Sequence, residues 1–333
     1  MAKHLSKEMY SEASRTGVTF TEILGTVSPS KIESLDAFEF ALMERGINPK
    51  KGTVEQFYTS TENSILFPEF INRNVRIGLT QSSKKEVVPE DLIATTVFID
   101  SGLYEAVKAE FSEKEVEYKR ISEGAKFPSV TISKGDKEIR LVKIGVNLNA
   151  PYEALRRMKL PLLATHIQLL GRRLRQTMVA IAVHTLVNGD GNGNQATINQ
   201  RAMSYATLVE FLLAMSPWES TIWFAKKELI EELLLLPELQ GSGLFNTSEG
   251  GLAKLLGNPL KKFEWPKTDL GNNQLFQVDK NAALELIKEA GSELAETDKV
   301  ITRQTEQTSI SLVFGMSKIF DEAAIIFEKL VQQ

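Results

Sequence analysis

The stretch PLLATHIQLLGRRLRQTMVAIAVHTLVN, residues 161–188, has no proline after its first residue and a single glycine. One set of side chains recurs at spacings of three and four, as one face of an α-helix requires: Leu163, Ile167, Leu170, Leu174, Met178, Ile181 and Thr185. Polar residues fall on the opposite side: Thr165, Gln168, Arg172 and Arg175. We therefore predict a helix of roughly 42 Å, starting at Pro161 and ended by Gly189-Asp190-Gly191, with one buried and one solvent- or partner-facing side.

The segment before this helix, residues 116–146, predicts a long two-stranded ribbon. Val116 and Tyr118 alternate on one arm, and Ile139, Leu141 and Lys143 alternate on the other. The polar residues 134–137, Lys-Gly-Asp-Lys, have the chemistry of a turn at its tip. An isolated two-stranded ribbon is marginal in water, so we expect the rest of the fold or another subunit to support it.

The remaining elements are predicted as follows. Residues 1 to about 60 form short helices, one opened by a Ser30/Glu33 capping box, and residues 64–79 form an extended piece. Residues 203–292 mix α and β: a helix over 205–215, a strand over 221–224, a helix over 226–236, and a tight turn into a strand over 255–260. Residues 282–290 suit a helix by pattern, and strands follow over 300–330.

Composition excludes several classes of protein. The 333 residues are 42% hydrophobic and 25% charged, with a net charge of −4 and no cysteine. Disulfides, thiolate metal sites and cysteine nucleophiles are therefore excluded, and wrapping of nucleic acid by bulk positive charge is disfavoured. No apolar run approaches the ~20 residues that span a bilayer, so no membrane partner is expected.

We find no motif for catalysis, a cofactor or a metal. His166 and His184 lie about 27 Å apart along the predicted helix and cannot share an ion. The Asp190-to-Asn194 stretch imitates a calcium loop, but it fails the rule at its sixth and twelfth positions, Gln195 and Arg201, so we interpret it as a glycine-rich helix stop. A local basic cluster fits either a solvated face or contact with nucleic acid or a neighbour: Arg156, Arg157, Lys159, Arg172, Arg173 and Arg175.

Taken in order, these elements resemble a known family. The resemblance rests on Ser122-to-Pro128 in a charged ribbon, Asn149-to-Leu155 before the long helix, and Asn188-Gly189-Asp190-Gly191 at its end, followed by 223–239, 251–260 and 303–330. Over about residues 61–330 the chain is similar to the major capsid proteins of tailed bacteriophages, the Hong Kong phage capsid fold, which encapsulin nanocompartments share.

The resemblance implies an α+β fold with an N-terminal arm, an extended E-loop ribbon, a peripheral domain with a spine helix, and an axial domain. The expected parts are a helical segment at 1–60, the arm and start of the peripheral domain at 61–115, and the E-loop at 116–148. The peripheral domain would take 149–202 and 293–318 with the spine helix at 161–188, and the axial domain 203–292 and 319–333.

The resemblance also implies a function. Subunits would assemble through hexamers and pentamers into an icosahedral virion shell around double-stranded DNA, formed in the host cytoplasm, with portal, scaffolding or decoration proteins as further partners. The candidate inter-subunit residues of the ribbon are Lys126, Lys134, Asp136, Lys137 and Arg140, and those facing DNA or a neighbour are Arg156, Arg157, Arg172 and Arg175. Covalent cross-linking by a ribbon lysine has no supporting motif.

The alternatives are an encapsulin-like shell that holds protein cargo, a phage tail or baseplate protein, and a soluble α/β enzyme such as a hydrolase, which the missing site motif disfavours. We expect no enzyme activity. We also expect residues 1–60 to be retained and ordered, whereas many members of the family lose a longer N-terminal segment to a protease.

Overall fold

The structure is a computed structural model. It describes residues 5–6, 8–16, 18–81, 85–100, 102–110, 131–151, 153, 157–240, 253–255, 257–263, 273–289, 294–300, 302 and 305–330. Two compact units divide the chain. Unit 1 comprises Met1–Gln81, Lys143–Arg175 and Glu289–Val313, and unit 2 comprises Ser82–Val142, Gln176–Lys288 and Phe314–Gln333.

Unit 1 begins with three short helices, α1 (Glu8–Thr16), α2 (Phe20–Val27) and α3 (Ala37–Glu44), followed by the 3₁₀ turn η1 (Val54–Tyr58). The predicted Ser30/Glu33 capping box is wrong. The Ser30 hydroxyl instead bonds both backbone groups of Ile32. The third helix is capped by Asp36, whose carboxylate accepts from the Glu39 backbone N–H at 2.8 Å. Short polar side chains can close local turns as well as helix starts, which is why the Ser30 spacing imitated a capping box.

A fourth helix, α4 (Thr61–Thr80), occupies the segment predicted to be extended, so that prediction is wrong. Pro68 argued against a helix because proline removes a backbone donor and crowds the preceding turn. Burial outweighs this cost, since Ile65, Leu66, Phe70 and Ile71 on this helix are all at most 6% exposed.

The long helix α6 (Leu160–Asn188) confirms the prediction for residues 161–188. Within unit 1 its first half crosses α4 through two glycines. A Cβ on Gly78 would lie 2.2 Å from the Gln168 carbonyl oxygen, and a Cβ on Gly171 would lie 2.5 Å from the Val75 carbonyl oxygen. The Gln168 amide also donates to Asn74 Oδ1 at 2.9 Å. Backbone contact at this crossing therefore requires glycine on both helices.

Strands complete unit 1. β11 (Leu294–Val300) runs antiparallel to the first part of β12 (Thr305–Lys318), in a register that pairs Leu294 with Ser311. β4 (Val142–Pro151) also pairs with β12. The core of this unit joins the N-terminal helices to α4 and α6, with Phe57, Leu66 and Ile167 fully buried.

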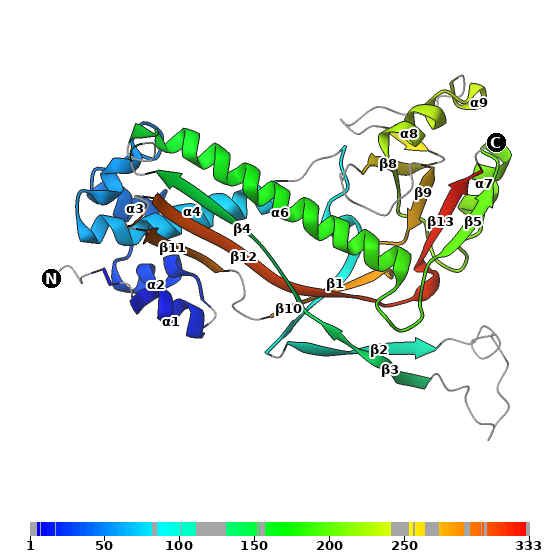
Figure 1. Cartoon of the computed structure of the whole chain (residues 1–333), viewed down its shortest axis with the longest axis horizontal. Helices are drawn as coiled ribbons and strands as arrows, with labels where there is room; N and C mark the ends of the chain where they lie inside the picture. Colours follow the sequence, from blue (N-terminus) through cyan, green and yellow to red (C-terminus); the bar gives the residue numbers. More distant parts are fainter. Residues whose placement is uncertain are drawn as a thin grey trace. The chain divides into compact units, whose positions relative to one another are not determined.

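Unit 2 contains a six-stranded sheet in the order β5-β13-β9-β6-β8-β7 (Figure 1). Its strands are β5 (Thr197–Arg201), β6 (Ile222–Ala225), β7 (Ala253–Leu255), β8 (Asn258–Lys262), β9 (Gln274–Val278) and β13 (Ala324–Lys329). Trp223, Leu275 and Phe327 pack with helices α7 (Tyr205–Leu213) and α8 (Lys227–Leu234). Phe224 and Phe276 stack with ring centroids 4.7 Å apart.

The predicted helices at 205–215 and 226–236 and the strand at 221–224 are confirmed by α7, α8 and β6. Pro237 ends α8, as predicted, and opens the short helix α9 (Pro237–Gln240). The helix predicted from the pattern at 282–290 is wrong. β10 (Leu284–Glu289) is a strand that pairs Leu286 with Met316 of β12. Unit 2 also contains η2 (Pro89–Asp91), β1 (Ile93–Ile99) and η4 (Asp321–Ala323).

Candidate functional site: the ribbon and its anchor

A two-stranded ribbon is present in unit 2, formed by β2 (Leu103–Glu110) and β3 (Thr131–Arg140), which run antiparallel (Figure 1). Its first described arm precedes the predicted range of 116–146. The turn predicted at 134–137 is wrong. Glu105 pairs with Glu138 and Val107 pairs with Lys134, so residues 135–137 oppose Ala106 alone. These polar residues form a bulge within the arm, and bulges use the same small and polar residues as turns. The arm predicted at 116–121 lies outside the described residues.

The base of the ribbon packs on β10. Ala106 and Ile139 are buried with Ile287 of β10. The Tyr104 hydroxyl donates to Glu285 Oε2 at 3.0 Å. Burial, and then the Glu285 carboxylate, raise the pKa of Tyr104 to about 12, so the hydroxyl keeps the proton that it donates. The ribbon is therefore fixed at its base by a small core and one polar contact.

The loop that ends α6 forms the second anchor. Asp190 Oδ1 accepts from the backbone N–H of Asn192 at 3.1 Å, and Oδ2 accepts from the Ser317 hydroxyl at 3.1 Å and the Lys318 N–H at 3.2 Å. Asn192 Oδ1 in turn accepts the Lys137 N–H of the ribbon bulge at 2.8 Å. Burial raises the pKa of Asp190, but these donors outweigh it and hold that pKa below its usual range.

A buried lysine completes this anchor. The Lys318 side chain is 1% exposed. Its ammonium donates to the carbonyl oxygens of Asn194 at 2.8 Å and Asp321 at 3.2 Å. The loop therefore connects the end of α6, the end of β12 and the ribbon. Sequence reasoning missed this role, although the run of short polar residues after Gly189 was the available signal.

Three of the five candidate inter-subunit residues have described side chains, and all three are exposed. Lys134, Lys137 and Arg140 are exposed on β3, and Lys134 pairs with Glu105 across the ribbon. Asp136 lies in the bulge, and Lys126 is outside the described residues. The ribbon thus exposes three cationic side chains among its described residues, while the backbone N–H of Lys137 bonds to the anchor loop.

The candidate basic face is only partly present. Arg157 is exposed and Arg172 is half-buried, whereas Arg156 is outside the described residues. Arg175 is only 4% exposed, so its placement on the exposed polar side of the helix is wrong. Helical spacing alone could not distinguish these arginines, because packing on more than one side of a helix widens its buried stripe.

The described residues show no group of three or more His, Cys, Asp or Glu side chains that could hold a metal ion. His166 and His184 are both exposed. The Asp190 carboxylate is occupied by protein donors, which agrees with its interpretation as a helix stop. Among the described helices, none is both long enough and apolar enough to cross a bilayer.

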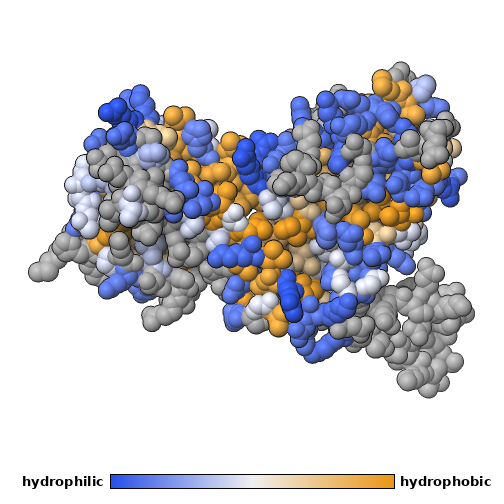
Figure 2. All heavy atoms as spheres, viewed as in Figure 1, coloured by the Kyte–Doolittle hydropathy of each residue, from blue (hydrophilic) through white to orange (hydrophobic). Residues whose placement is uncertain are grey.

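Large apolar side chains reach the surface. On the face shown in Figure 2, hydrophobic residues lie in several patches between hydrophilic ones. In unit 2 the largest exposed fractions belong to Leu213, Leu235 and Phe98, at 71%, 68% and 67%. In unit 1 the outer side of α6 exposes Leu162 and Leu169. Exposed patches of this kind often mark surfaces that bind other proteins.

No family model and no curated protein matches the sequence. Solved structures do match. The capsid of a native GTA particle is 12% identical, with 75% of this chain and 95% of that chain covered and a TM-score of 0.53. A cyanophage capsid is 15% identical, with 76% and 91% covered and a TM-score of 0.50. The SrpI encapsulin complex from Synechococcus elongatus is 9% identical, with 76% and 95% covered and a TM-score of 0.51.

These structures are shells of two kinds, capsids and an encapsulin, and the match covers nearly their whole length. The ribbon, the long helix and the mixed sheet unit described above are the parts that the sequence resemblance implied. The chain has the Hong Kong phage capsid fold.

Proposed function

We propose that this chain is a major shell subunit, which assembles through hexamers and pentamers into an icosahedral capsid around double-stranded DNA. The observation that carries the proposal is the match to shell proteins, which spans 91% of the cyanophage capsid chain and 95% of the GTA capsid chain. A shell subunit acts through surfaces between copies and needs no catalytic residue. This agrees with the sequence, in which we find no catalytic motif.

Two features of the surface support association between copies. The core described for the ribbon lies at its base and is made by Ala106, Ile139 and Ile287, and two-stranded ribbons need a support to be stable in water. Exposed apolar side chains on unit 2, including Leu213 and Leu235, would be covered by neighbouring copies. Negative-stain microscopy of the purified protein tests the proposal. Closed polyhedral shells are expected, and a field that contains small discrete particles or tubes without shells would refute it.

The structure refines where the ribbon can be shortened without unfolding the chain. Ile139 belongs to a buried cluster, so a deletion that removes it would damage the fold. Replacing residues 111–130 with a short glycine-serine linker keeps β2 and β3. We expect this variant to remain folded by circular dichroism and to lose stable shells. Normal assembly of the shortened chain would contradict an assembly role for the ribbon.

The contents of the shell distinguish the two kinds of solved relatives. Double-stranded DNA is our first proposal, and protein cargo, as in an encapsulin-like nanocompartment, is the alternative that the match to the SrpI encapsulin complex favours. Absorbance at 260 and 280 nm on nuclease-treated particles separates them. Protected nucleic acid supports the virion, and its absence together with a co-purifying protein inside supports the nanocompartment.

The domain roles are also part of this proposal. The spine helix is α6, the E-loop is the ribbon, and the six-stranded sheet of unit 2 belongs to the axial domain near the capsomer centre. Assembly would take place in the host cytoplasm with portal, scaffolding or decoration proteins.

Basic side chains on α6 and just before it are proposed to face DNA or a neighbour. Arg157 and Arg172 are the testable ones, because Arg175 is buried and Arg175→Glu would reverse the sign of a buried charge and unfold the chain. Charge reversal at both should lower the yield of filled particles at low salt and leave the melting temperature unchanged. An unchanged yield would count against this assignment.

A further inference from the structure

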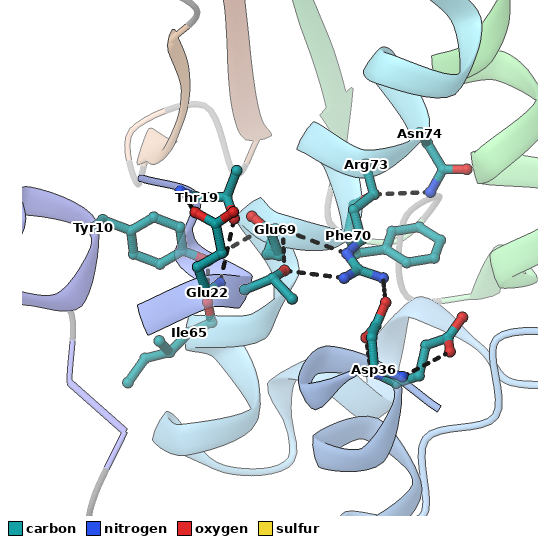
Figure 3. Close-up of polar contacts among 11 residues, drawn as sticks. Tyr10, Thr19, Glu22, Asp36, Ile65, Glu69, Phe70, Arg73 and Asn74 are labelled. Carbon is teal, nitrogen blue, oxygen red and sulfur yellow. Dashed lines mark hydrogen bonds and ion pairs between the residues drawn. The ribbon is translucent and has the colours of Figure 1, made fainter. Parts of the chain in front are cut away.

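A side chain from α1 bonds the backbone of helix α4 at the turn that contains Pro68. In an uninterrupted helix the Glu69 N–H would bond the Ile65 carbonyl directly, but Pro68 disturbs this turn. The Tyr10 hydroxyl lies between the two groups. It accepts from the Glu69 N–H at 3.1 Å and donates to the Ile65 oxygen at 2.7 Å (Figure 3). Tyr10 therefore satisfies both backbone groups at the proline turn.

A second polar contact joins α2 to the same stretch of α4. The Glu69 side chain is only 3% exposed. Its Oε1 atom accepts from the Thr21 hydroxyl at 2.8 Å, and Arg73 donates to the same hydroxyl oxygen at 3.0 Å. The buried carboxylate thus has a donor from the N-terminal helices as well as the neighbouring Arg73 on its own helix.

Apolar packing surrounds these polar contacts. Tyr10 stacks on Phe20 with ring centroids 4.2 Å apart and an interplanar angle of 11°. Phe20, Ile23 and Leu24 of α2 belong to the same buried cluster as Ile65 and Leu66 of α4. Packing of α1 and α2 on α4 therefore combines burial of apolar surface with hydrogen bonds that fix the position of the two helices.

The chain between α2 and α3 is different. Residues 31–34 are exposed and lie outside any helix or strand. A protease would find a cleavable segment here, since exposed irregular chain is the preferred site of nicking. The covalent link and the contacts to α4 are thus separate attachments of the first two helices.

We infer that α1 and α2 bind their own chain's α4 as a non-covalent cap, with Tyr10 bonded to the α4 backbone beside Pro68 and Thr21 bound to buried Glu69, so that cleavage between α2 and α3 does not release them. The partner of this surface on α4 is the N-terminal segment of the same chain. The first helices are in this respect an integral part of the subunit.

The experiment cuts the chain and asks whether the pieces stay together. A recognition site for a site-specific protease is inserted between Glu33 and Ser34 in the full chain, and the cleaved protein is examined by size-exclusion chromatography and native mass spectrometry. We expect residues 1–33 to remain bound to the rest without denaturant. Release of this fragment from the cleaved wild-type protein would overturn the inference.

Matched variants test the polar contacts. In Thr21→Val the hydroxyl that bonds Glu69 is lost, whereas in Thr26→Val, on the same helix, the lost hydroxyl bonds only the Ile23 carbonyl. We expect Thr21→Val and Tyr10→Phe each to raise the dissociation constant of the fragment about tenfold, because each removes hydrogen bonds between the fragment and buried polar groups of α4. Thr26→Val should change it by less than about twofold. Equal effects of the two threonine variants would refute the polar part.

Discussion

The N-terminal helices and the ribbon both contain apolar and charged residues, but the chain stabilises them differently. The helices bury Phe20, Leu24 and Leu42 in a cluster that continues through α4 and α6. Among the ribbon side chains whose burial is described, Ala106 and Ile139 are buried at its base, against Ile287. The helices therefore belong to the folding unit, whereas the ribbon is held at one end and has its remaining length available for other contacts.

This difference predicts where a mutation acts. A change among the N-terminal helices, α4 and α6 should lower the free energy of unfolding. A change on the exposed part of the ribbon should leave folding intact and alter only association. The four predictions below test this contrast, from the largest expected effect on stability to the smallest.

The largest effect is expected at the crossing of α4 and α6. In Gly171→Ala the new Cβ would lie 2.5 Å from the Val75 carbonyl oxygen, a distance that forces the helices apart. We expect a loss of about 3 kcal/mol in the free energy of unfolding, measured by urea denaturation. Gly102→Ala, at the start of the ribbon, is the matched control because no atom lies within 4 Å of its Cβ. A similar loss in both variants would remove the contrast.

The anchor below the ribbon should come next. Asp190→Ala removes the acceptor of the Ser317 hydroxyl and of the Lys318 N–H. Leaving these buried donors unpaired should cost about 2 kcal/mol. Because the pKa of Asp190 is held low in the folded state, its contribution is present above the pKa of the unfolded carboxyl and is lost as pH falls through the folded pKa. The wild-type and variant unfolding free energies should therefore converge in acid; a constant difference down to pH 2 would be contradictory.

Much of the fold could be predicted from sequence because it follows from local periodicity. Residues 161–188 and the elements at 205–236 were predicted with their boundaries nearly correct. Two of the failures share one physical cause, which is packing from distant sequence. The helix around Pro68 is bonded by the hydroxyl of Tyr10, which lies 59 residues before Glu69 in the sequence. The strand at 284–289 depends on its pairing with β12.

The candidate site was predicted less well than the fold. The ribbon was located, but its turn was placed at residues that form a bulge opposite Ala106. Polar residues with glycine satisfy both structures, so composition could not separate them. Arg175 was assigned to the exposed side by spacing, yet it is 4% exposed. Asn192, which holds the bulge, carried no motif, because its role exists only when the ribbon is beside it.

A smaller effect is expected at the cap of α3. Asp36 accepts from the Glu39 N–H and pairs with Arg73 at 2.7 Å. Burial raises its pKa, but the bonds from Arg73 and Glu39 lower it more, so the pKa lies below its usual range. Asp36→Ala should cost about 1 kcal/mol, as is usual for a helix cap. This loss should be full at neutral pH and shrink in acid as the wild-type carboxyl is protonated. Urea midpoints measured between pH 2 and pH 7 test it.

The smallest effect on folding is expected on the ribbon surface, and it decides whether the contrast is real. Lys134 pairs with Glu105, but both side chains are largely exposed, at 73% and 56%. Exposed pairs contribute little, so Lys134→Ala should change the free energy of unfolding by less than about 0.5 kcal/mol. If the ribbon acts between copies, the same variant should lower the yield of shells at fixed protein concentration by light scattering, and Lys254→Ala, an exposed lysine on β7, should affect neither quantity. A loss of stability without a loss of assembly would place Lys134 in the folding unit. Only a residue that stabilises its own chain can lower the free energy of unfolding and leave the yield of shells unchanged.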